Sequence, residues 1–110
     1  MNIENTMIGT VKIILPVAPS LDASNAASFF DQISPLLTDS SRVVIDLEKI
    51  EFIDSAGIGV LISCLRIATE GKAKLVLCRL NRPVKALFEL MRMHRVFEIY
   101  QNRESAVGAA

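Results

Sequence analysis

The segment Glu51–Leu61, EFIDSAGIGVL, holds the residues of this chain that are best placed to do chemistry. An acid, Asp54, and a hydroxyl, Ser55, stand between a short apolar stretch and an apolar helix that Gly57 and Gly59 open. A serine at such a junction either caps the helix by accepting a bond from a backbone amide or, when exposed, accepts a phosphate from another enzyme. Capping is the commoner use, and Asp54 can cap in place of Ser55. Both interpretations stay open at this point.

Catalysis by Ser55 is a weaker hypothesis, because a serine nucleophile needs a base and a group that orients the base. The single histidine, His94, precedes the last predicted strand and has no evident route to Ser55. The sequence IDSAG also differs from the G-x-S-x-G turn of serine hydrolases, since Ile53 stands where that turn has glycine. We therefore expect no catalytic residue and no enzymatic activity, and a hydrolase that uses Ser55 remains a third hypothesis without a base.

Composition predicts one soluble domain over residues 1–110, with 51% hydrophobic and 22% charged residues. The apolar stretch 56–68 contains Arg66 and is shorter than the roughly 20 residues of a membrane span, and the N-terminus resembles no secretion signal. Cys64 and Cys78 lack C-x-x-C spacing, so we expect buried free thiols, no metal site and no cofactor. These features predict a cytoplasmic protein without direct membrane insertion.

The zero net charge hides two halves of opposite sign. Residues 1–54 carry three basic and eight acidic side chains, whereas residues 55–110 carry nine basic and four acidic ones. Such polarity either steers a charged protein partner or reflects solvated faces that attract each other within one fold. Nucleic-acid binding is disfavoured, because the basic residues are scattered and aromatic residues make up only 5% of the chain.

The hydrophobic pattern alternates strands with helices after an initial hairpin. Val11, Ile13 and Leu15 alternate with other residues, which predicts a strand buried on one face. The expected elements are strands 2–6 and 10–17 around a turn at 7–9, a helix over 22–37 weakened by Pro35, strand 43–47, helix 55–70 followed by Gly71 as a C′ residue, strand 74–78, a helix from Arg82-Pro83 with the apolar stripe Val84, Leu87, Phe88 and Met91, strand 96–100, and a helical turn over 104–110.

This order predicts an α/β fold with a mixed, largely parallel sheet of four to five strands, an N-terminal hairpin and about four flanking helices. Loops at the carboxyl ends of parallel strands gather at one edge of the sheet. We therefore expect loops 18–22, 54–57 and 79–82 to converge there. Gly57 and Gly59, which lack a Cβ atom, leave room for another protein to approach. Arg79 and Arg82 would then either screen a phosphate on Ser55 or contact the partner.

The segment VVIDLEKIEFIDSAGIGVLISCL resembles the signature of STAS-domain anti-sigma factor antagonists, in which F-x-D-S-x-G-L-G follows a strand that ends in D-L. The resemblance extends to SLDA at Ser20–Ala23, to KLVLCRLNRPVKALFELM and to VFEIY. The chain differs from the family at two points: Ala18-Pro19-Ser20 replaces a usual glycine, and MRMHR lacks a glycine that often precedes the last strand.

The resemblance implies a partner-switching phosphoprotein of bacterial transcription regulation. In that family the unphosphorylated protein binds an anti-sigma factor that is also a serine kinase, and a sigma factor is released. The kinase then phosphorylates the serine after the motif's aspartate, here Ser55, and a metal-dependent Ser/Thr phosphatase reverses the reaction. The resemblance also implies a monomer. The matching partner-binding residues are Ser20, Asp22, Asp54, Ser55, Ala56, Gly57, Ile58 and Gly59.

The leading alternative is a STAS subunit of an ABC-type lipid or solute transport complex. In that case the helix that begins at Ser55 would dock permanently on the transporter's ATPase. No phosphate on Ser55 would be needed.

Overall fold

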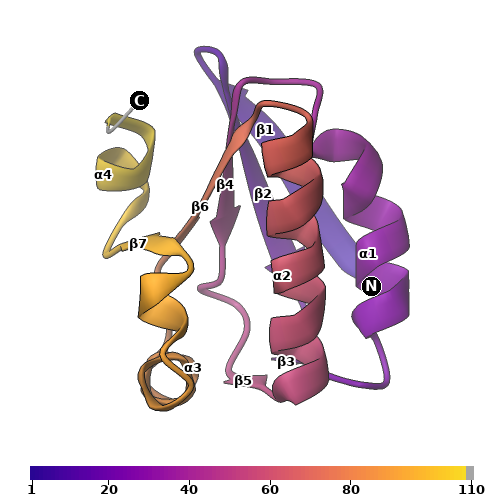
Figure 1. The fold of residues 1–110 in the computed structure, drawn as a ribbon, viewed down its shortest axis with the longest axis vertical. Helices are drawn as coiled ribbons and strands as arrows, with labels where there is room; N and C mark the ends of the chain where they lie inside the picture. The colour runs from indigo at the N-terminus through magenta and orange to yellow at the C-terminus, as the bar shows by residue number, and fades with distance from the viewer. Residues whose placement is uncertain (109–110) are drawn as a thin grey trace.

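A computed structural model describes residues 1–108 of the chain and places a five-stranded sheet between helices (Figure 1). The strand order is β1-β2-β4-β6-β7, and a separate two-stranded pair joins β3 to β5. The strands are β1 (Asn2–Ile8), β2 (Val11–Val17), β3 (Ser20–Leu21), β4 (Arg42–Asp46), β5 (Phe52–Ile53), β6 (Lys74–Cys78) and β7 (Glu98–Tyr100). The helices are α1 (Ala26–Ile33), α2 (Ser55–Glu70), α3 (Arg82–Leu90) and α4 (Arg103–Gly108), with 3₁₀ turns η1 (Ser34–Leu36) and η2 (Met93–Arg95).

The pairing confirms the predicted mixed sheet. β1 and β2 form an antiparallel hairpin, and β2, β4, β6 and β7 run parallel to one another. The predicted turn at 7–9 was too long, because Met7 and Ile8 belong to β1. Gly9 has a φ of +62°, a left-handed conformation that suits glycine in a tight hairpin turn.

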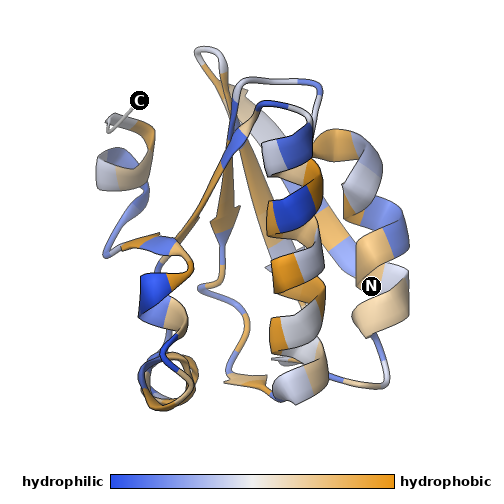
Figure 2. Cartoon of the chain, viewed as in Figure 1, coloured by the Kyte–Doolittle hydropathy of each residue, from blue (hydrophilic) through white to orange (hydrophobic). Residues whose placement is uncertain are grey.

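Both faces of the central strands are buried. α1 and α2 cover one face with Val43 and Ile45 of β4, while Val44 packs with Ala106 of α4 on the other face (Figure 1). The central residues of β4 and β6 are therefore hydrophobic, whereas the helices alternate hydrophobic and hydrophilic residues (Figure 2). The prediction of a half-buried β2 was wrong: residues 11–14, Lys12 included, are all buried.

Several element bounds differ from the predictions for local reasons. Helix α1 begins at Ala26 rather than Asp22, because Asp22 turns the chain and its side chain accepts bonds from the Ser24 amide and hydroxyl. Beyond Ile33 the helix tightens into η1, which contains Pro35 and confirms the predicted weak turn.

The ends of α2 and α3 correct two further predictions. Gly71 is the C-cap residue of α2 and has a φ of −83°, so it is not the left-handed C′ residue that was predicted. The residue with a positive φ, 64°, is Lys72. A Cβ atom on Gly71 would lie 2.4 Å from Thr38 Cγ2, which makes close packing the reason for glycine there. In α3, Val84 and Phe88 are buried as predicted, but Met91 is exposed.

The last strand of the chain starts later than predicted, and a short helix follows it. β7 starts at Glu98 instead of residue 96, because η2 and the exposed Val96 precede it. The predicted turn over 104–110 corresponds to α4 as far as Gly108; residues 109–110 lie outside the described residues.

A buried carboxylate holds α4 and the β6–α3 connection to the back of the sheet. Asp46, at the end of β4, is 0% exposed and accepts hydrogen bonds from Arg79 Nε and Nη2 and from Arg103 Nε, at 2.5 to 3.1 Å. Arg42 adds a second attachment by donating from Nε and Nη2 to the Ala106 carbonyl oxygen, at 3.0 and 2.9 Å. Burial alone would raise the pKa of Asp46, but the hydrogen bonds from both arginines outweigh burial and lower this pKa below its ordinary value.

We predict that Asp46→Asn lowers the free energy of unfolding at neutral pH by about 3 kcal/mol, because two arginines lose their counter-charge. Since the pKa of Asp46 is lower in the folded protein, its stabilisation is complete above about pH 4 and is lost as the pH falls through the folded-state pKa. Urea unfolding at several pH values measures this. Glu48→Gln is the control, because Glu48 pairs with Arg79 but is 42% exposed. The prediction would be contradicted if the difference in the free energy of unfolding between wild type and Asp46→Asn did not shrink in acid.

Two glycines of α2 make a second, matched test. A Cβ atom on Gly57 would lie 2.2 Å from the Leu21 carbonyl oxygen, whereas one on Gly59 would meet nothing within 4 Å. We predict that Gly57→Ala lowers the free energy of unfolding by about 2 kcal/mol through this clash. Gly59→Ala should raise it by up to about 1 kcal/mol, because alanine favours helix. Equal effects of the two substitutions in denaturant titrations would argue against the close contact.

Candidate functional site

The short β3–β5 pair brings two loops together at the start of α2 (Figure 1). Ser20 pairs with Phe52 and Leu21 with Ile53, and the Asp54 amide donates to the Leu21 carbonyl oxygen at 3.3 Å. The carbonyl of Pro19, in the loop that differs from the family pattern, accepts from the Glu51 and Phe52 amides. The predicted convergence of loops 18–22 and 54–57 is thus confirmed.

Asp54, and not Ser55, caps α2. Its Oδ1 accepts from the Gly57 amide at 2.9 Å, and its Oδ2 accepts from the Ala23 amide at 3.2 Å. One carboxylate therefore satisfies the helix N-terminus and fastens the β3–α1 loop to it. Of the two caps that the sequence left open, the structure selects the aspartate.

Ser55 is left free for another use. It is the first residue of α2, its side chain is exposed, and its hydroxyl has no hydrogen-bond partner among residues 1–108. No base is bonded to it within that range either, and His94 lies on η2 beside a cavity at α3. The geometry offers Ser55 to an approaching molecule but does not activate it as a nucleophile.

Two acidic side chains lie on the loops that carry and approach Ser55. Asp22 accepts hydrogen bonds from the side chains of Ser24 and Ser20, which lower its pKa and keep it ionised. The Asn25 side chain ties the same loop by donating to the Ser20 carbonyl oxygen at 2.8 Å. Asp22 and Asp54 thus place two carboxylates on the loops that meet at Ser55.

The remaining predicted contact residues divide into accessible and buried ones. Ala56 is half-buried and Gly59 is exposed, whereas Gly57 and Ile58 are buried. The interpretation that Gly57 leaves room for a partner is therefore corrected: that space is filled by the chain's own Leu21 carbonyl. Gly59, whose Cβ position is open, still fits the original interpretation.

Phe52 is an accessible side chain near Ser55 that was not among the predicted contact residues. Its side chain is 55% exposed although it is aromatic, and it lies in β5 three residues before Ser55. The neighbouring Ile53 is buried, so β5 shows the period of a strand with one buried face. This alternation within EFID was the sequence signal that could have indicated an exposed Phe52. A strand of two residues is too short for the pattern to determine which side chain faces solvent.

The third loop, 79–82, serves another purpose. The Arg79 guanidinium pairs with Asp46 and with Glu48, and the Asn81 side chain donates to the carbonyl oxygens of Glu48 and Ile50. Arg79 is therefore occupied on the back of the sheet, which contradicts its suggested role beside the phosphate. Arg82 lies at the start of α3 and lines the cavity there.

The two thiols are inert by their surroundings. Cys64 and Cys78 are free and buried, as predicted. Burial raises the pKa of Cys64 to about 12, and burial followed by the charge of Asp46 does the same for Cys78. Within residues 1–108 no three His, Cys, Asp or Glu side chains are grouped so as to hold a metal ion.

Comparison with known proteins identifies the domain. The family model described as the STAS domain matches residues 2–106. BtrV of Bordetella bronchiseptica, named as a candidate anti-sigma factor antagonist, is 34% identical over 68 residues. These are 62% of this chain and 59% of BtrV, so the match spans less than two thirds of that relative.

Solved structures share the fold over nearly the whole chain. The crystal structure of a candidate anti-sigma factor antagonist from Thermotoga maritima has a TM-score of 0.88 at 22% identity, and the match covers 97% of this chain and 92% of that one. The phosphorylated form of the Bacillus cell fate determinant SpoIIAA has a TM-score of 0.69 at 15% identity and is matched over 98% of each chain. Among the described residues no helix is long and apolar enough to cross a membrane. The chain is a member of the STAS domain family.

Proposed function

We propose that this protein is an anti-sigma factor antagonist controlled by phosphorylation of Ser55. Its unphosphorylated form binds an anti-sigma factor that is also a serine kinase, and a sigma factor is thereby released in the bacterial cytoplasm. The kinase phosphorylates Ser55 and ends the complex, and a metal-dependent Ser/Thr phosphatase restores it. The observation that carries the proposal is the exposed Ser55 hydroxyl at the start of α2, left unbonded because Asp54 caps the helix.

The helix end tolerates a phosphate on Ser55. A phosphoserine carries nearly two negative charges, and the positive end of the α2 dipole favours negative charge in the first turn. Because the Asp54 side chain already satisfies the Gly57 amide, the modification breaks no hydrogen bond of the described residues. Phosphorylation therefore changes the surface and leaves the packing of α2 intact.

The charges around Ser55 explain why a phosphate would end the complex. Asp22 and Asp54 already make this edge acidic, and Arg79 is held by Asp46 and Glu48 and does not neutralise it. A partner that docks here needs a complementary surface with apolar and cationic groups. The added phosphate introduces bulk and unbalanced charge at the centre of the contact, so the complex dissociates.

The partner-binding surface consists of side chains that the fold leaves accessible near Ser55. Phe52 supplies an apolar anchor, and the open side of Gly59 lets a partner approach the first turn of α2. Ser20, Asp22, Asp54 and Ala56 complete the surface, whereas Gly57 and Ile58 contribute by holding the loops in place. The names of the relatives support the same class of function, since BtrV is named as an antagonist of this kind.

We predict that the immobilised unphosphorylated protein captures a serine kinase from a lysate of the bacterium that encodes it. Adding ATP and Mg²⁺ should release the kinase from wild type while phosphate appears on Ser55. Ser55→Ala should capture the kinase and keep it, because no phosphate can form. Mass spectrometry of the captured and released fractions measures both steps.

Two controls separate a switch from damage to the fold. A phosphoserine placed at position 55 should abolish capture of the kinase, and the melting temperature should stay within a few degrees of the unmodified protein's. Ser41→Asp, directly before the start of β4, should capture the kinase normally. Capture of a transporter ATPase in place of a kinase would favour the docking-subunit alternative. Release by ATP from Ser55→Ala as fully as from wild type would refute the proposal.

We further predict that Phe52→Ala weakens kinase binding by about tenfold or more, because exposed aromatic anchors carry much of the energy of such interfaces. The free energy of unfolding should change little, since the ring is 55% exposed. Leu90→Ala is the matched control: Leu90 is 80% exposed at the C-terminal end of α3, and its loss should leave affinity unchanged. Surface plasmon resonance with the purified kinase gives the dissociation constant of each variant. If Phe52→Ala and Leu90→Ala change this constant equally, Phe52 does not belong to the interface.

A further inference from the structure

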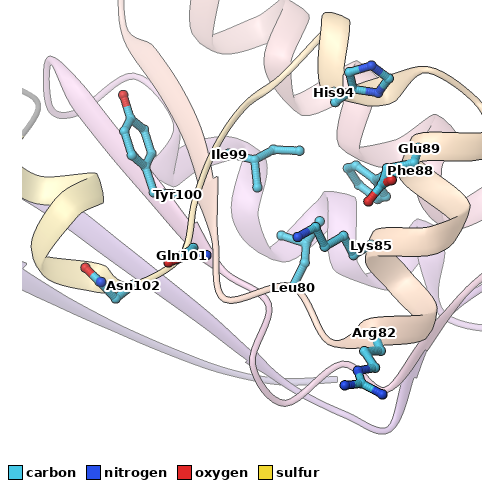
Figure 3. Close-up of a pocket in the computed structure, with 10 residues that line it drawn as sticks. All are labelled: Leu80, Arg82, Lys85, Phe88, Glu89, His94, Ile99, Tyr100, Gln101 and Asn102. Carbon is cyan, nitrogen blue, oxygen red and sulfur yellow. The ribbon is translucent and has the colours of Figure 1, made fainter.

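A cavity of about 990 Å³ lies between α3 and the chain around β7 (Figure 3). Its volume is at the upper end of the range found for sites that bind small organic molecules. Three parts of the chain form its walls: α3 on one side, the η2 turn above, and β7 with its following loop on the other (Figure 3). The lining residues are Leu80, Arg82, Lys85, Phe88, Glu89, His94, Ile99, Tyr100, Gln101 and Asn102.

The floor of the cavity is apolar. Phe88 is 1% exposed and its ring packs against Phe97, with centroids 5.9 Å apart, so this part of the wall is fixed. Leu80 and Ile99 are half-buried and point into the space between α3 and β7 (Figure 3). An apolar body placed there would be removed from water on several sides, which favours binding.

The rim of the cavity is cationic. Arg82 and Lys85 outnumber the single carboxylate, Glu89, among the lining side chains. Within residues 1–108 neither Arg82 nor Lys85 has a carboxylate oxygen within 4.0 Å, although Arg79 and Arg103 nearby in the fold are both ion-paired. Figure 3 shows Lys85 extending from α3 across the cavity toward Leu80. The two cations are thus available to an anion.

We propose that this cavity binds a small organic carboxylate with an apolar body of medium chain length. The carboxylate would bind Lys85, which reaches across the cavity, with Arg82 adding positive charge at the rim, and the apolar body would lie against Leu80, Phe88 and Ile99. A purely acidic peptide would use the rim and leave the apolar floor uncovered, so the amphipathic ligand fits the lining better. The site is independent of the function proposed for Ser55, because no residue of that edge lines the cavity.

Titration of the ¹⁵N-labelled protein with octanoate tests the proposal, and octanamide is the neutral probe of equal size. We expect saturable shifts of the amide signals of Leu80, Lys85, Gln101 and Asn102 with octanoate, and binding at least about tenfold weaker with octanamide. The double variant Arg82→Gln, Lys85→Gln should weaken octanoate binding by about tenfold. Both side chains are exposed, so the variant should keep the wild-type spectrum elsewhere.

The matched control Arg66→Gln, Lys72→Gln removes the same charge from exposed positions on and after α2, and it should bind octanoate as wild type does. The proposal is overturned if no signal at the cavity saturates, if octanamide binds equally well, or if both double variants weaken binding alike. A poly-glutamate peptide that shifts these signals where octanoate does not would also overturn it, in favour of a peptide site.

Discussion

The approach of the Leu21 carbonyl to Gly57 is the constraint on which the geometry around Ser55 depends. Only a residue without a Cβ atom fits at position 57, and Asp54 uses both carboxylate oxygens to fix the contact, one on the Gly57 amide and one on the Ala23 amide. The same carboxylate that caps α2 therefore joins two loops that are about thirty residues apart in the chain. Because the cap is supplied by Asp54, the next side chain, Ser55, stays exposed and unbonded in the described structure.

The opposite end of the chain is organised around a second carboxylate. α4 is short, and its apolar contribution to the back of the sheet is mainly Ala106, which packs with Val44 and neighbouring side chains. Polar contacts make up for this small apolar surface: Asp46 holds Arg103 of α4, and Arg42 donates to the Ala106 carbonyl. Asp46 also holds Arg79, so the loop before α3 and the last helix depend on one buried charge. This division leaves the Ser55 edge acidic and the α3 side cationic, the asymmetry visible in the sequence halves.

The sequence predicted the mixed, largely parallel sheet, α2 from Ser55 to Glu70 and the meeting of two loops, because long periodic segments and parallel topology determine them. It did not predict that β2 is buried on both faces, since Ile14, on the face expected to be exposed, packs in the core with residues of α1 and α2 such as Phe29 and Leu61. Nor did it show that Gly57 faces the chain's own backbone, or that Arg79 belongs to Asp46. The cap at Asp54, the exposed Phe52 and the cavity at α3 all depend on side-chain positions that the spacing of residues in one chain does not determine.

The proposed switch requires that Ser55 carries a phosphate in the cell. Intact-mass spectrometry with peptide mapping detects this phosphate when it is applied to the protein purified from its own cells and from a Ser55→Ala strain. A mass increase of about 80 Da, the addition expected for one phosphate, is predicted to map to Ser55 and to disappear in the variant. Protein that stays unmodified at Ser55 under every growth condition, or a phosphate that maps to another residue and persists in Ser55→Ala, would contradict the account.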